Sequence, residues 1–169
     1  MNDLLMEKAS EIIKNILYIN IASITAEGKP WNSPVYSAFD KNLNFYWLSW
    51  KLNQHSENIR NNSSVFVTIY DSTVPAGTGL GVYLEGKAYE LSNPKEILQG
   101  TIQVYRREKR KPRDVIQFLN KFPRRVYKFV PERLWVNGED KLDGNFIDKR
   151  IEIKLEDLRR EFFSNDSAD

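Results

Sequence analysis

Few residues in this chain could carry out chemistry by themselves. The sequence holds no cysteine, which excludes a disulfide framework, thiolate zinc sites, iron–sulfur clusters and a cysteine nucleophile. It holds one histidine, His55, so a multi-histidine metal centre or a Ser-His-Asp site would have to be built around that residue. We therefore expect neither a metal site nor a histidine-based hydrolytic site.

The serines and glycines do not supply the missing chemistry. Ser37, Ser49 and Ser72 lack the G-x-S-x-G context of a hydrolase nucleophile, and the glycines at 77, 79 and 81 do not form a phosphate loop. The acidic residues show no obvious pairing for general acid–base catalysis. The catalytic side chains stay unknown at this stage, and any catalysis needs another source.

The most strongly charged stretch covers residues 106–113, with six cations in eight positions. Such a run can bind nucleic acid, but Tyr105 is the one adjacent aromatic residue for stacking, and the net charge is only +2. Nucleic acid is therefore not the expected partner. The alternatives are an anionic substrate, the phosphate of a nicotinamide cofactor, or a solvated junction between a helix and a loop.

Length and composition favour a single globular domain over residues 1–169. Hydrophobic residues make up 41% of the chain and charged residues 28%, which excludes disorder as its main description. No apolar run approaches the roughly 18 residues of a membrane span, and Asp3, Glu7 and Lys8 stand where a signal peptide would be apolar. We expect a cytoplasmic protein without a membrane partner, and a frayed tail beyond Phe163.

Hydrophobic periodicity predicts one helix and then three strands at the start of the chain. Apolar residues between Leu4 and Leu17 recur at three- and four-residue steps, with Asp3 as a plausible N-cap. The expected strands cover residues 18–24, 31–39 and 44–50. Because short turns join these strands, we expect them to form a meander.

The rest of the chain mixes helices and strands. A short, mostly exposed helix is expected within residues 53–62, with Asn53 or Ser56 as its cap. Further helices are expected from Asn93 and over 112–121, and further strands over 65–70, 81–91, 125–130, 133–136 and 150–155. These elements predict an α+β protein, an antiparallel β-barrel with peripheral helices.

Six segments follow one another in an order that is more specific than any one of them alone. They are residues 18–23, 28–31, 33–35, 45–49, 55–60 and 83–88, with a weaker echo at Trp135. In this order they resemble the pyridoxamine-phosphate-oxidase-like FMN-binding proteins. The resemblance implies an antiparallel split β-barrel with peripheral helices.

The resemblance also implies a homodimer that binds FMN at the subunit interface, with the phosphate near the third strand and the following short helix. A flavin phosphate needs donors from a helix N-terminus, hydroxyl groups and at least one cation. The resemblance places Leu48 in the cofactor site, and the segment after it offers such groups at Ser49, Lys51, Asn53, Gln54, His55 and Ser56. Gln54 and His55 stand where many family members have arginine or lysine, and a histidine beside a phosphate is expected to be protonated.

On the second strand, Asn32, Ser33, Pro34 and Val35 match the region that runs along the isoalloxazine ring in the family. Proline suits a strand that lacks a ladder partner at that amide. An edge strand with a surface tryptophan is the alternative interpretation of this region. By the same resemblance, Trp135 of the partner subunit is expected to pack near the ring.

The implied function is that of an FMN-dependent oxidoreductase with a small-molecule substrate, for which a reduced nicotinamide is one candidate. Relatives that use the deazaflavin F420 or bind haem make these two groups the alternative cofactors. Pyridoxamine phosphate oxidation itself is not expected, because the arginine- and histidine-bearing substrate motif has no match after Trp135. A non-enzymatic flavin, F420 or haem binding protein and a nucleic-acid-binding module remain the alternatives.

Overall fold

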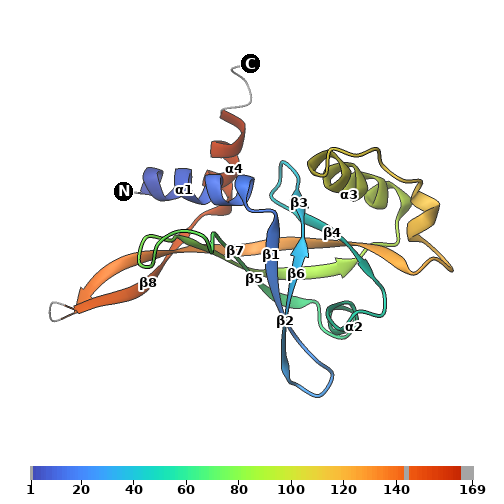
Figure 1. Cartoon of the computed structure of the whole chain (residues 1–169), viewed down its shortest axis with the longest axis horizontal. Coiled ribbons are helices and arrows are strands. Elements are labelled where there is room, and N and C mark those ends of the chain that lie inside the picture. The colour runs from blue at the N-terminus through green and yellow to red at the C-terminus, as the bar shows by residue number, and fades with distance from the viewer. Residues whose placement is uncertain (1, 143–144, 165–169) are drawn as a thin grey trace.

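The computed structural model describes residues 2–142 and 145–164, which form one antiparallel sheet with helices around it (Figure 1). The strands are β1 (Tyr18–Ile24), β2 (Pro30–Tyr36), β3 (Ala38–Phe39), β4 (Phe45–Trp50), β5 (Ser64–Tyr70), β6 (Gly81–Glu90), β7 (Arg124–Leu142) and β8 (Asn145–Ile153). The helices are α1 (Asn2–Asn15), α2 (Gln54–Asn61), α3 (Pro94–Arg107), the 3₁₀ helix η1 (Val115–Phe118) and α4 (Leu155–Ser164).

The sheet curls into a barrel that stays open on one side. Its strand order is β2-β1-β5-β6-β7-β4-β3, and β8 pairs with β7. Although β2 and β4 stand near opposite ends of this order, they contact each other without pairing. The prediction of an α+β class with an antiparallel, split barrel is therefore confirmed.

Alternating side chains give the sheet a buried and an open face. On β5, Val65, Val67 and Ile69 are buried in the core, whereas Phe66 between them is half-buried. Tyr83 and Trp135 lie on the same open face as Phe66. A second, smaller core lies between β4 and α3, where Tyr46 and Val126 pack against Ile97 and Val104. No helix in the described part of the chain is both long and apolar enough to cross a membrane.

The predicted three-stranded meander is wrong. The second strand ends at Tyr36, and the chain then enters the separate strand β3, which pairs with β4. Strand β2 pairs with β1, whereas β4 pairs with β7, from Phe45 opposite Phe129 to Trp50 opposite Arg124. Turn signals reveal hairpins but not a partner strand about 80 residues away, so local patterns could not predict this pairing. Asp3, expected as an N-cap, lies within the first turn of α1.

Three expectations for the second half of the chain also need correction. The helix expected over 112–121 is reduced to η1, and the two strands expected over 125–130 and 133–136 are one long strand, β7. Pro131 is accommodated within β7 because the register with β6 shifts between Glu85 and Gly86. Leu155 begins α4 instead of ending a strand. The tail expected to fray lies, from residue 165 onward, outside the described residues.

Candidate cofactor site

The helix α2 packs one face against the rest of the protein, so the prediction of a mostly exposed helix is wrong. His55, Ser56, Asn58 and Ile59 are buried. The Ser56 hydroxyl donates to the Trp50 carbonyl (2.9 Å), and Asn58 Nδ2 donates to Ser23 Oγ (2.9 Å). These bonds fix the start of α2 against the end of β4 and fix its buried face against β1.

Three of the predicted phosphate residues form a compact polar cluster at the start of α2. Ser49 Oγ and His55 Nε2 are 2.8 Å apart, and Asn53 Nδ2 donates to Ser49 Oγ over 2.8 Å. Asn53 is the N-cap residue, but within the described structure its side chain makes no capping hydrogen bond to the helix. The Ser56 N–H donates to the Asn53 carbonyl (2.9 Å), which leaves the backbone N–H groups of Gln54 and His55 as donors beside the cluster.

Burial changes the expected protonation of His55. The imidazole is 7% exposed, and this burial lowers the pKa of His55 from its ordinary value of 6.5. Without a ligand, the ring is therefore neutral near pH 7, and its protonation beside a bound phosphate stays a prediction. A neutral imidazole still donates one N–H and accepts at its other nitrogen.

A proton NMR titration of His55 checks this protonation state, because the chain contains no other histidine. We expect a titration midpoint below 6.5 in the native protein and a return to about 6.5 in urea. Since the folded-state pKa is lowered, the stability linked to His55 is present above pH 6.5 and is lost as the pH falls through the folded value. A native midpoint at or above the urea value would contradict the assignment.

The two other polar residues of this segment lie beside the cluster. Gln54 is half-buried, and its Nε2 donates to Asn58 Oδ1 (2.9 Å) along the helix. The backbone of Lys51 is held at both ends, because its N–H donates to the Pro123 carbonyl (2.9 Å) and its carbonyl accepts from Arg60 Nη2 (2.6 Å). Lys51 is the one lysine or arginine in residues 49–56 and so the permanent cation of the predicted phosphate segment.

An ion-pair network around Glu90, which the sequence did not predict, holds this segment in place through Arg60. Glu90 accepts hydrogen bonds from Arg60 Nη1 (2.9 Å), Arg125 Nε (3.1 Å) and the Tyr127 hydroxyl (2.9 Å). Burial, followed by the bond to Glu90, raises the pKa of Tyr127. Because Arg60 also holds the Lys51 carbonyl, Glu90 helps to position the candidate site. Its partners lie 30 to 37 residues away in sequence, so no spacing rule could identify them.

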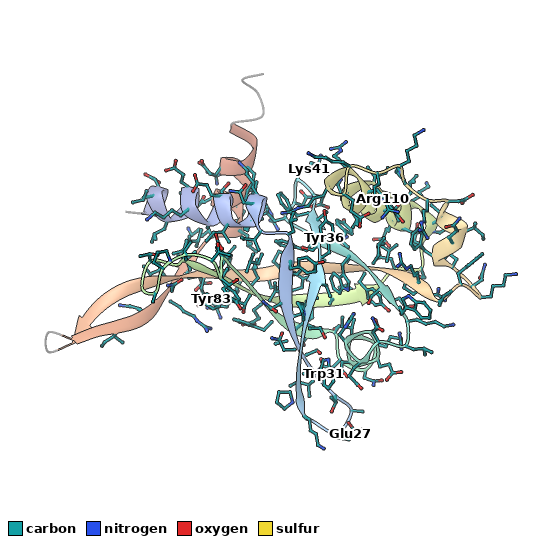
Figure 2. All side chains as sticks on the ribbon, viewed as in Figure 1. Glu27, Trp31, Tyr36, Lys41, Tyr83 and Arg110 are labelled. Carbon is teal, nitrogen blue, oxygen red and sulfur yellow. The ribbon has the colours of Figure 1, made fainter. Side chains whose placement is uncertain are left out.

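The second-strand residues lie on an exposed edge beside α2. Strand β2 ends the described strand order, and Figure 2 shows Trp31 on this hairpin at the lower end of the molecule. Asn32 and Pro34 are exposed, and Ser33 Oγ accepts from Trp31 Nε1 (3.1 Å). The Val35 side chain is buried in the core, so only its backbone can face a ligand. Because α2 contacts β2, this edge and the polar cluster adjoin each other.

Within one chain, Leu48 and Trp135 lie apart from the polar cluster at α2 and from the edge of β2. The Leu48 side chain packs against the smaller core beside α3, on the opposite side of β4 from Ser49. Trp135 lies on the open face of the sheet, where its ring stacks on Phe66 at 6.3 Å between centroids. Strands β1, β5 and β6 separate β7 from β2 in the sheet. Among the described residues, no cluster of acidic residues and histidine could hold a metal ion.

Comparison with known proteins agrees with this architecture. The structure of the haem-binding protein from Mycobacterium smegmatis has a TM-score of 0.64 at 15% identity, covering 92% of this chain and 60% of that protein. HutZ, the haem storage protein from Vibrio cholerae, has a TM-score of 0.63 at 16% identity, covering 77% and 92% of the two chains. An F420 reductase has a TM-score of 0.54 at 16% identity, covering 74% and 94%.

These identities establish a common fold and nothing finer. This chain spans 60% of the length of the mycobacterial protein. No curated protein sequence matches it. The family model for pyridoxamine 5'-phosphate oxidase, however, matches residues 5–137. The chain therefore belongs to the pyridoxamine 5'-phosphate oxidase family of split-barrel proteins.

Proposed function

We propose that the protein is an FMN-dependent oxidoreductase that binds its cofactor as a homodimer and acts on a small molecule. The observation that carries the proposal is the polar cluster of Ser49, Asn53 and His55 at the N-terminus of α2. A hydroxyl, an amide, an imidazole and free backbone N–H groups suit an acceptor-only phosphate. The positive end of the helix dipole adds to this preference for an anion.

The residues present fit a flavin phosphate better than a haem. Haem iron takes a histidine, cysteine, methionine or tyrosine as its axial ligand. The cluster of Ser49, Asn53 and His55 holds no cysteine, methionine or tyrosine, and its histidine is buried with Nε2 already in contact with Ser49. A phosphate, by contrast, needs only the donors that the cluster holds, with Lys51 as the nearby cation. The same donors could hold a phosphate group of F420, so the contacts to the ring decide between FMN and F420.

The chain's own residues would bind and orient the cofactor. Ser49, Asn53 and His55 would hold its phosphate, and the backbone of residues 32–35 on the unpaired edge of β2 would hydrogen-bond the polar edge of its ring. Bound FMN would supply the transfer of a hydride or of single electrons, which no side chain in this site provides.

The open face of the sheet supports the dimer. Phe66, Tyr83 and Trp135 gather there half-buried, and two guanidinium groups cover them: Arg150 lies 4.2 Å from the Tyr83 ring centroid and Arg133 lies 4.5 Å from that of Trp135. Aromatic residues and arginine are the types enriched at the centres of protein interfaces. We assign this face to contact with the second subunit, which would bring its Trp135 toward the flavin.

Light scattering checks the dimer. We expect a mass of about twice 19.8 kDa for the native protein at micromolar concentration and a single-chain mass for Trp135→Glu, because a buried carboxylate would face the partner. Leu98→Glu is the matched control, since Leu98 is an exposed apolar residue on α3 and its variant should stay dimeric. A single-chain mass for the native protein would exclude the shared site.

The redox role has its own experiment. The FMN-loaded protein is mixed without oxygen with NADH or NADPH, and the flavin absorbance is followed. Loss of the absorbance of oxidised flavin with either nucleotide would support an oxidoreductase with a nicotinamide reductant. Unchanged absorbance with both would exclude that reductant for this protein.

A further inference from the structure

A second concave site lies where α1, the β3–β4 turn and α3 meet. Its volume is about 770 Å³, within the range of small-molecule sites. Figure 2 shows Lys41 at this end of the molecule, whereas Trp31 and Glu27 mark the opposite end, near α2. The cleft is therefore separate from the candidate cofactor site.

Positive charge dominates the walls of this cleft. Lys14, Lys41, Arg106 and Arg107 line it, and of the described lining residues Asp40 alone is acidic. The side chains of Lys41 and Arg106 are exposed and make no ion pair or hydrogen bond with any part of the chain that the structure describes. Both cations are thus available to a ligand.

Asp40 keeps its negative charge, but among the described residues it makes no ion pair with these cations, because its carboxylate is hydrogen-bonded to neutral groups of the turn and of β4. Its Oδ1 accepts from the backbone N–H groups of Asn42 (2.8 Å) and Asn44 (3.0 Å). Its Oδ2 accepts from Asn44 Nδ2 (3.0 Å) and from the Tyr46 hydroxyl (2.9 Å). With four donors on one carboxylate, the turn is rigid and holds Lys41 at the mouth of the cleft.

Arg107 builds the wall between α1 and α3. Its Nη2 donates to the carbonyls of Lys14 (2.8 Å), Ile16 (2.8 Å) and Ile13 (3.3 Å), which are the unpaired groups at the end of α1. Burial lowers the pKa of Arg107, and among the described residues this guanidinium makes no ion pair with a carboxylate. Its charge therefore adds to the positive field of the cleft.

The same cleft also has an apolar surface. The Phe39 and Phe162 rings meet edge to face with their centroids 5.3 Å apart. Arg107 lies 5.5 Å from the Phe39 centroid, and Lys14 Nζ lies 4.9 Å from the Phe162 centroid. Cations beside aromatic faces suit a ligand that combines an anionic group with a flat apolar group.

We propose that this cleft binds a small organic phosphate, with the phosphate between Lys41 and Arg106 and the apolar part against Phe39. Two unpaired cations match the double negative charge of a phosphate monoester better than the single charge of a carboxylate. The proposal goes beyond the flavin site and does not depend on it. It also gives part of the basic segment a role: Arg106 and Arg107 face the cleft.

Calorimetric titration of the full chain with AMP, adenosine and inorganic phosphate tests the proposal. We expect AMP to bind roughly tenfold or more tightly than either fragment, and the double variant Lys41→Gln/Arg106→Gln to abolish that difference. The matched control is Lys111→Gln/Arg113→Gln, which removes two exposed cations of the same segment that do not line the cleft. This control should bind AMP as the native protein does.

A second control separates the two sites, because AMP could also use the phosphate donors at α2. Asn53→Asp places a negative charge at α2 and should leave AMP binding unchanged. Equal affinities for AMP and adenosine, unchanged AMP binding in the Lys41→Gln/Arg106→Gln variant, or loss of AMP binding in Asn53→Asp would each overturn the cleft as an organic phosphate site.

Discussion

Replacing Asn53 with aspartate is expected to weaken FMN binding about 100-fold while leaving riboflavin binding unchanged. Asn53 Nδ2 is one of the donors at the start of α2, and aspartate replaces this donor with a carboxylate of nearly the same shape. Two unit charges about 4 Å apart repel by about 4 kcal/mol at an effective dielectric constant of about 20. Salt screening of this partly exposed site lowers the repulsion to about 3 kcal/mol, which corresponds to roughly 100-fold in affinity. Titration of flavin fluorescence measures both affinities.

The substitution should not harm the fold, which keeps the result interpretable. Aspartate is as good an N-cap as asparagine, and a negative charge at this end of a helix is favourable. Asn62→Asp is the matched control, because it makes the same change at the opposite end of α2, where Asn62 is the C-cap. The control should bind FMN nearly as the native protein does. Equal FMN affinity for Asn53→Asp and the native protein would show that the flavin phosphate does not bind at α2.

Replacing Glu90 with alanine is expected to lower the free energy of unfolding by about 3 to 5 kcal/mol. Glu90 is the acceptor for Arg60, Arg125 and Tyr127, and the Arg125 side chain is 11% exposed. Without Glu90, the buried Arg125 charge keeps its hydrogen bonds to the carbonyls of Asn120, Phe122 and Arg124 but has no carboxylate partner among the described residues. Removing one partner of a buried pair costs more than the pair contributes when intact. Urea denaturation of the native and variant proteins measures the difference.

The matched control for Glu90 is Glu96→Ala. Glu96 also pairs with a basic residue, but its contact with Lys128 is 3.8 Å long and its side chain is 47% exposed. Exposed pairs of this kind contribute about 0 to 1 kcal/mol, so this variant should stay close to the native stability. A Glu90→Ala variant no less stable than Glu96→Ala would show that the Glu90 network is not a structural support of α2.

Local patterns predicted the parts of the fold that depend on neighbouring residues. The strand over residues 18–24 and the helix after Asn93 both occur as expected, because alternation and capping are properties of short windows. The pairing of β4 with β7 and the insertion of β3 were missed, since nothing in residues 38–50 encodes a partner near residue 127. The length of β7 was missed because Pro131 is tolerated only through a bulge.

The candidate site was predictable in its residue types but not in its electrostatics. The sequence placed Ser49, Asn53 and His55 together, and the structure shows Asn53 and His55 each within hydrogen-bond distance of Ser49. It could not show that His55 is buried, because burial depends on how α2 packs against β1. Leu48 was included by its neighbourhood alone, whereas strand alternation turns its side chain away from Ser49.

The most direct test of the central claim is the affinity of the native protein for FMN against riboflavin, with F420 and haem titrated alongside. The two flavins share one ring and differ in the phosphate, so their ratio isolates the donors at α2. Since a charge-assisted phosphate contact contributes about 1.5 to 3 kcal/mol, we expect FMN to bind at least roughly tenfold more tightly than riboflavin and more tightly than F420 or haem. Equal affinities for FMN and riboflavin, or tighter binding of haem or F420, would contradict the account.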